Sequence, residues 1–210
     1  MAQSSRHFRL CQFLFFALIW SATAYPQEFK PRLQLSAQAG PVIFDDLYQF
    51  HNSGRYAISG SVRLNKYFHA LLRAGFIPAR QYFATPVGVQ DAEVNLYELA
   101  VGAKLHSAKF FSSRLRTYFS MLGGVLLYRP QPVLVPIGFG GKVQIDPPNA
   151  TKPLVSAATG VAWQMTSTIA LSLGFEVSLS CLAERFTDGT SRELWRPFYS
   201  ATLGIAANVK

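Results

Sequence analysis

The sequence predicts an all-β fold: an antiparallel, up-and-down transmembrane β-barrel of about eight strands. Large apolar and small polar residues alternate along most of the chain, as successive side chains of a β-strand do. Only 15% of the 210 residues are charged although 50% are hydrophobic, whereas about 25% of a soluble domain is charged. In addition, short and long connections between the alternating segments follow one another in turn.

The alternation justifies the strands one by one. In chain order they are residues 32–43, 56–65, 69–77, 94–105, 115–128, the two halves of 154–182, and 197–210. Residues 166–168 (Thr-Ser-Thr) join the halves of 154–182, which predicts a β-hairpin. Large apolar residues occupy one face of each strand, in order Leu33 and Leu35, Ile58 and Val62, Leu72 and Phe76, Leu99 and Val101, Phe119 and Met121, Val155 and Val161, Leu171 and Leu173, and Leu203 and Ile205.

The connections alternate in length. Short ones lie around residues 66–68, 107–114 and 166–168, and long ones are 44–55, 78–93, 129–153 and 187–196, which hold most of the Pro, Asp and Asn. An up-and-down arrangement therefore places all long loops at one end. Strands of about 10 residues match the length that a tilted strand needs to cross a bilayer. Within 129–153, Val133, Val135, Ile137 and Phe139 alternate, which predicts strands that extend beyond the membrane or fold over the barrel mouth.

The residue types on the second face of each strand indicate which of the two faces meets lipid. In a soluble secreted barrel, the alternative fold, that face would be solvated and rich in Lys, Glu and Asp. Here it carries mainly Gly, Ala, Ser, Thr and Gln, which suit the crowded interior of a small barrel. Its isolated charges have both signs, and enclosed charges are costly unless they are paired. We therefore predict an interior polar and ionic network of Arg32, Arg63, Arg73, Glu98, Lys104, Arg116, Glu176 and Glu184.

Aromatic residues gather at the strand ends, where membrane barrels carry belts at the two interfaces. Those near the short turns are Tyr67, Phe68, Phe110, Phe111 and Trp163. Those near the long loops are Phe44, Tyr56, Tyr82, Phe83, Tyr128, Phe186, Trp195 and Tyr199. An ordinary soluble core would explain their number but not their placement.

The first 24 residues have the features of a secretory signal peptide. Arg6 and Arg9 form a basic head, residues 10–20 are apolar, and 22–24 (Ala-Thr-Ala) is a small-residue cleavage site. We expect cleavage after Ala24 and a barrel domain over 25–210, with Cys181 as its single cysteine and hence no internal disulfide. The net charge of +9 would fall to +7. This charge suits outer-membrane lipid and lipopolysaccharide phosphates, whereas an exported chain without a basic, aromatic-rich run predicts no nucleic-acid partner.

The signal peptide, the alternating connections and strand phrases such as residues 56–64 (YAISGSVRL) and 171–175 (LSLGF) resemble the small bacterial outer-membrane β-barrels of the OmpA/OmpX type. The resemblance implies a bacterial outer-membrane location with the termini in the periplasm and the long loops outside. It also implies a non-enzymatic role in envelope integrity, or in adhesion through loops that meet an extracellular partner. We expect a monomer.

Two alternative functions stay open: a lipid A or phospholipid-modifying enzyme, and a narrow pore. His51 and Ser53 resemble the His and Ser of lipid A deacylases, although residues 52–54 (Asn-Ser-Gly) are also ordinary turn chemistry. His69 and His106 have no second ligand at a spacing expected for zinc. The sequence therefore predicts no catalytic residue, no cofactor and no metal, and the charged interior predicts little conductance.

Overall fold

The computed structural model describes residues 33–45, 50–65, 67–85, 88–106, 114–137, 141–185 and 191–209. The predicted signal peptide, its cleavage site and Arg32 lie outside these residues, as does the side chain of Glu184. No helix in the described part of the chain is long and apolar enough to span a membrane.

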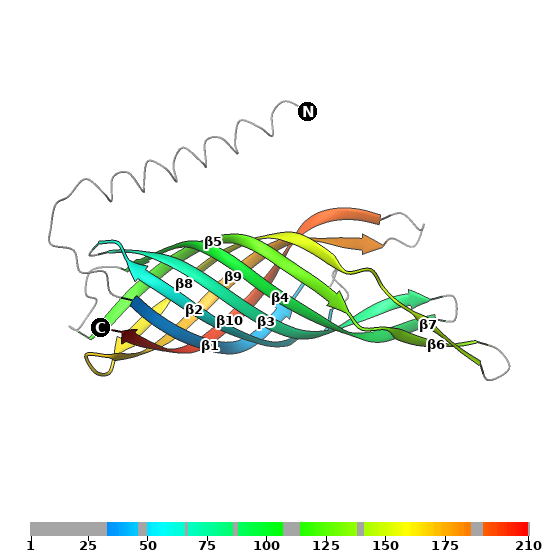
Figure 1. Cartoon of the computed structure of the whole chain (residues 1–210), viewed down its shortest axis with the longest axis horizontal. Helices are drawn as coiled ribbons and strands as arrows, with labels where there is room; N and C mark the ends of the chain where they lie inside the picture. The colour runs from blue at the N-terminus through cyan, green and yellow to red at the C-terminus, as the bar shows by residue number, and fades with distance from the viewer. Residues whose placement is uncertain are drawn as a thin grey trace, which may run out of the picture.

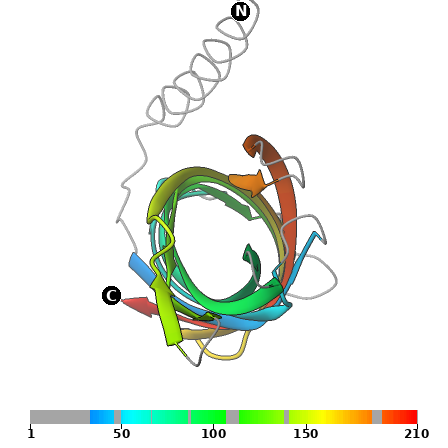
Figure 2. The same ribbon diagram turned by 90° about the vertical axis from the view of Figure 1, so that its right-hand side faces the viewer.

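Strands make up the fold, and eight of them close a barrel (Figures 1 and 2). Around the barrel the order is β1-β10-β9-β8-β5-β4-β3-β2, with antiparallel neighbours throughout, while β6 and β7 form a separate two-stranded sheet. The expected up-and-down barrel is thereby confirmed. The bounds are β1 Leu33–Phe44, β2 Ser53–Arg63, β3 Phe68–Thr85, β4 Gly88–His106, β5 Leu115–Pro130, β6 Val133–Ile137, β7 Gly141–Ile145, β8 Ala150–Gln164, β9 Ile169–Arg185 and β10 Ser191–Val209.

The barrel is apolar outside and polar inside. Along β1, exposed Leu33 and Leu35 alternate with half-buried Gln34 and Ser36. Large apolar side chains are more than half exposed around the circumference, among them Ile58, Leu72, Leu99, Val101, Met121, Leu173, Leu203 and Ile205. A soluble protein does not present a continuous apolar surface of this extent to water. The outward face is that of a transmembrane barrel, and the soluble alternative is wrong.

Three of the long connections are shorter than expected. Residues 78–93 are not a loop, because β3 and β4 pair without a break. The pairing runs from Phe68 opposite Leu105 to Thr85 opposite Gly88. The alternation continues through this stretch despite its Pro and charged residues, with Ala79 and Ala92 buried. Similarly, β2 begins at Ser53 and β10 at Ser191, inside the segments expected to be loops.

The connection at 129–153 contains the β6–β7 hairpin, which projects beyond the end of the barrel beside the far ends of β3 and β4 (Figure 1). Val133 and Val135 of β6 are buried together with Ala92 of β4. The Gln131 amide donates to the Glu93 carbonyl at 2.8 Å, which continues the β4–β5 pairing toward the hairpin. We call β6, β7, residues 79–85 of β3 and residues 88–94 of β4 the outer arm.

The aromatic belts are only partly as expected. Tyr67 and Trp163 near the short turns, and Tyr56, Trp195 and Tyr199 near the long loops, are exposed on the outer face. Two expected belt residues instead face the lumen. Phe44 is buried because it follows outward-facing Ile43, and Tyr128 packs against the same interior cluster. Phe110, Phe111, Phe186 and the Phe83 side chain lie outside the described residues.

Candidate functional site

The lumen contains a buried ion network of two arginines and two glutamates. Arg55 of β2 places its Nη2 2.5 Å from Glu98 Oε2 and 3.0 Å from Glu176 Oε1. Arg73 of β3 places Nη1 2.7 Å from Glu176 Oε2 and Nη2 3.8 Å from Glu98 Oε2. All four side chains are almost fully buried, so a missing partner would leave a charge uncompensated. The charges balance, and the pairs tie β2, β3 and β4 to β9 on the far wall.

Hydroxyl groups extend the ion network to further strands. Arg55 Nη1 donates to Ser200 Oγ of β10 at 3.0 Å, and Arg73 Nη2 donates to Ser156 Oγ of β8 at 3.3 Å. Ser178 Oγ donates to Glu176 Oε1 at 3.0 Å. Such hydrogen bonds are needed because a buried ion pair repays its loss of hydration only when its remaining polar groups are satisfied.

A glycine makes room for one of the carboxylates. A Cβ at Gly75 of β3 would stand 2.6 Å from Glu98 Oε2, well inside contact distance. Gly75 faces the lumen directly opposite Glu98 in the β3–β4 register. Any larger residue there would displace the carboxylate from its arginine partners.

An apolar cluster closes the lumen on the long-loop side of the ion network. Its members are Val42, Phe44, Phe50, Ile77, Ala79, Val94, Leu96, Leu126, Leu154 and Phe198, all buried. Ile77 follows Arg73 on the inner face of β3, and Leu96 precedes Glu98 on that of β4. Hydrophobic constrictions of this kind exclude water and ions. Polar access to the ion network is therefore from the short-turn end.

Five basic side chains lie on the short-turn side of the ion network, and we call them the basic vestibule: Arg63, His69, Lys104, His106 and Arg116. Arg63, His69 and Lys104 are adjacent across β2, β3 and β4 in the strand register. The His69 and His106 rings are 4.7 Å apart, and both lie within electrostatic reach of Lys104, Arg63 and Arg116. Like charges on neighbouring strands repel one another.

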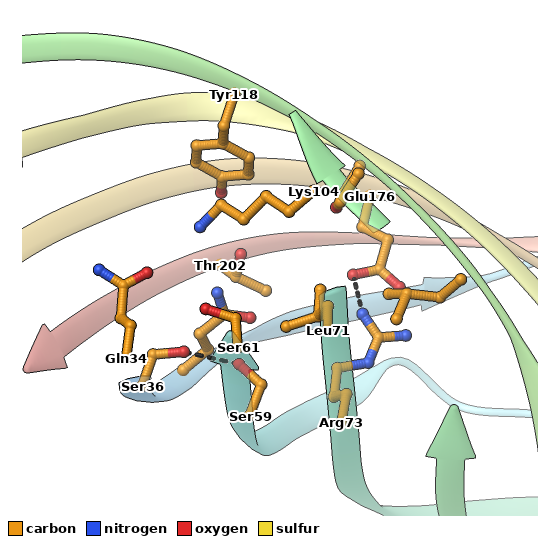
Figure 3. A pocket seen from close by; sticks show the side chains of 14 residues that line it. Gln34, Ser36, Ser59, Ser61, Leu71, Arg73, Lys104, Tyr118, Glu176 and Thr202 are labelled. Atoms are coloured by element: carbon orange, nitrogen blue, oxygen red, sulfur yellow. Dashed lines mark hydrogen bonds and ion pairs between the residues drawn. The ribbon is translucent and has the colours of Figure 1, made fainter. Parts of the chain in front are cut away.

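A small cavity separates the ion network from Lys104 (Figure 3). It has room for about one or two water molecules. Lys104 Nζ lies 4.2 Å from the centre of the Tyr118 ring, and Ser36 and Ser59 share a hydrogen bond of 2.6 Å. Hydroxyl, amide and charged groups line the cavity, including Gln34, Gln38, Ser61, Ser120, Arg73 and Glu176.

The structure divides the predicted interior set into two groups. Arg73, Glu98 and Glu176 come together in the ion network. Arg63, Lys104 and Arg116 lie in the basic vestibule and form no ion pair among the described residues. Arg32 and the Glu184 side chain lie outside the described part.

Arg55, which like Arg73 contacts both glutamates, was not predicted because it was placed in the loop 44–55. The strand pattern contained the signal, since Arg55 precedes Ala57 and Ser59 by even steps and so shares their inner face. The serine and glycine before it obscured this, because Ser-Gly is also typical of turns.

The outer arm carries exposed apolar side chains away from the barrel wall. Leu134 of β6 is 58% exposed, and Val143 and Ile145 of β7 are 45% and 39% exposed. Val143 and Ile145 pair with Val135 and Val133 and so share one apolar face of the hairpin with them. Ala92 of β4 packs against Val133 and Val135 and leaves Val143 and Ile145 exposed. Leu134 pairs with Gln144, one residue out of phase, and therefore lies on the opposite face of the hairpin.

His51 and Ser53 do not form the pair that a nucleophile needs. His51 Nε2 lies 3.2 Å from Asp91 Oδ1 of β4, and its ring contacts that of Tyr82 at a tilted angle, on the outside of the molecule. The Ser53 hydroxyl donates to backbone carbonyls, those of Pro78 and Gly54. An activated serine must instead pass its proton to a base. No cluster of three or more metal-ligating side chains occurs among the described residues.

No protein-family model matches the chain, and no curated protein matches it in sequence. Among solved structures, it is similar to Neisserial surface protein A, with a TM-score of 0.53 and 15% identity over 84% of this chain and 96% of that chain. It is also similar to OprG of Pseudomonas aeruginosa, with a TM-score of 0.49 and 6% identity over 85% of this chain and 94% of that one. The first likeness shows the fold: the chain is a small eight-stranded barrel of the outer-membrane type.

Proposed function

We propose that the protein is a non-enzymatic barrel of the bacterial outer membrane that presents its outer arm to an extracellular partner. Lipid and lipopolysaccharide surround the outward apolar face, and the short turns and both termini face the periplasm. Residues 1–24 serve as the signal peptide, with cleavage after Ala24. The protein acts as a monomer, since the lipid-facing band continues around the whole circumference.

The observation that carries the adhesive role is the contrast between the lumen and the outer arm. The lumen is filled by the ion network and the apolar cluster, which favours neither a pore nor an interior binding site for a large ligand. The outer arm, by contrast, exposes Val143 and Ile145 on one face of a paired hairpin and Leu134 on its other face. An exposed apolar patch on an ordered element is typical of protein-binding surfaces. The expected partner is therefore a protein surface.

The test uses cells that display the full-length chain. The variant Leu134→Ser, Val143→Ser, Ile145→Ser keeps the hairpin but removes its apolar side chains, and Gln144→Ser is the matched polar control. We expect the triple variant to lose most adherence to protein-coated surfaces, at least tenfold, while Gln144→Ser adheres like the wild type. Heat-modifiable gel mobility verifies that each barrel is folded in the outer membrane.

The same cells distinguish adhesion from an envelope role. If the triple variant adheres like the wild type while deletion of the whole chain makes the outer membrane permeable to a hydrophobic dye, the adhesive role is wrong and the envelope role holds. An outer-membrane fraction without the protein, together with unchanged gel mobility after boiling, would contradict the location itself.

A further inference from the structure

The basic vestibule lacks counter-charges, unlike the ion network above it. Arg63 Nε donates to the Asn65 carbonyl at 3.0 Å, and Lys104 rests on the Tyr118 ring. The sequence has no Asp or Glu in residues 56–90, 99–145, 147–175 or 194–210, which include the short-turn halves of β2 to β5 and β8 to β10. The described lumen therefore provides no carboxylate to these cations on the short-turn side.

Two unsatisfied polar atoms lie in the basic vestibule itself. His69 Nδ1 and His106 Nδ1 are buried and have no hydrogen-bond partner, and the other two such side-chain atoms in the described residues, Arg73 Nε and Glu98 Oε1, belong to the ion network. Buried polar atoms without a partner are rare and commonly indicate a bound water or ion. Here the two atoms belong to neighbouring, mutually tilted rings beside Lys104.

The sign of the charges selects the ligand. Lys104, Arg63 and Arg116 would repel a metal cation from the two histidines, whereas an oxyanion would accept hydrogen bonds from all of these groups. The cavity next to Lys104 adds hydroxyl donors, among them Ser61, Ser120 and Thr202. Glu176 also lines this cavity, but its carboxylate is paired with Arg55 and Arg73. Access is from the short-turn end, because the apolar cluster closes the other side.

We propose that the basic vestibule binds a small oxyanion of the phosphate class, with Lys104, His69 and His106 as its inner ligands and Arg63 and Arg116 at the entrance. The oxyanion balances charges that the barrel strands leave unbalanced. Two sources offer this chemistry, namely free phosphate and the phosphodiester headgroup of an anionic lipid. The basic vestibule is separate from the outer arm, so this proposal can be tested independently of the adhesive role.

The first experiment titrates inorganic phosphate into the full chain folded in an uncharged, phosphate-free maltoside detergent, with sodium chloride holding ionic strength constant. Isothermal calorimetry should show saturable binding. Lys104→Met should weaken it about tenfold or more, since a hydrogen bond to a charged group is lost. The matched control Lys142→Met makes the same charge change on β7, at the opposite end of the molecule, and should bind like the wild type. His69→Asn, His106→Asn provides a second disruption in case Lys104→Met fails to fold.

The second experiment identifies the source. The chain is placed in phosphatidylcholine vesicles with or without phosphatidylglycerol, and its urea midpoint is measured. A midpoint that rises with phosphatidylglycerol in the wild type but not in Lys104→Met, without any response to inorganic phosphate, assigns the lipid headgroup. Equal responses of Lys104→Met and the wild type, responses that chloride reproduces at equal ionic strength, or no response in either experiment would overturn the proposal.

Discussion

Arg55 is the residue on which the interior depends most. It donates from Nε and Nη2 to Glu98, from Nη2 to Glu176 and from Nη1 to Ser200, and so contacts side chains of three other strands. Removing it would leave two buried carboxylates with Arg73 as their single cationic partner in the ion network. Burial makes such an imbalance expensive, because neither water nor another cation can replace the lost charge.

Arg55→Met is therefore expected to lower the free energy of unfolding by about 3–5 kcal/mol. The matched comparison is Arg80→Met, because Arg80 forms an ion pair with Glu93 at 3.8 Å in which both side chains are more than half exposed. That change should cost about 0–1 kcal/mol. Urea unfolding in phosphatidylcholine vesicles, followed by tryptophan fluorescence, gives both values. Equal losses in the two variants would show that the ion network does not stabilise the barrel.

The double variant Arg55→Met, Glu98→Leu serves as a control for this interpretation. It removes one charge of each sign and leaves Arg73 paired with Glu176, so it should recover part of the stability that Arg55→Met loses. If it is instead as unstable as the sum of the two single variants, the loss reflects packing and not charge.

At the scale of the residue, the sequence was informative wherever a charge fell inside a clear alternation. Arg73, Glu98 and Glu176 lie in the middle of strands, and their inward phase followed from their neighbours. Arg55 was missed because it starts a strand after turn-forming residues. The position of Lys104 relative to Glu176 could not be predicted either, since it depends on the stagger of one strand against the next.

At the scale of the element, the strands are longer than the membrane-crossing segments that the sequence marks. β3 and β4 contain 18 and 19 residues, whereas the alternation identified only 69–77 and 94–105. The predicted strands were too short because Pro78, Asp91 and Glu93 are residues typical of loops. In the structure these residues are tolerated since their side chains lie on the exposed face of the hairpin.

The elements should also differ in resistance to proteolysis. The β6–β7 hairpin has five residues in each strand, and Lys142 of β7 is exposed, whereas the barrel strands are paired on both sides. Trypsin added to intact cells should therefore cut first at Lys142, because short two-stranded sheets open readily. Mass spectrometry of the fragments locates the cut. Replacing Lys142 with Gln should delay the first cleavage, while first cleavage within the barrel strands would contradict this ranking.

At the scale of the whole molecule, the lumen is layered along the barrel axis. The apolar cluster lies toward the long loops, the balanced ion network follows, and the cavity and basic vestibule lie toward the short turns. The sequence predicted a polar interior throughout. It could not predict the layers, because residues at one level come from between four and eight strands whose relative positions only the closed barrel defines.

The layering predicts that the barrel does not conduct ions, and that the apolar cluster is the barrier. Planar bilayers containing the wild-type chain should show no steady channels. Leu126→Ser, Phe198→Ser makes the constriction smaller and hydrophilic, and it should produce openings, because water can then enter between the ion network and the long loops. Val133→Ser, Val135→Ser makes the same kind of change in the outer arm, outside the lumen, and should leave the barrel closed. Steady channels in the wild type would contradict a closed barrel. A folded Leu126→Ser, Phe198→Ser barrel that does not conduct would show that another layer of the lumen is the barrier.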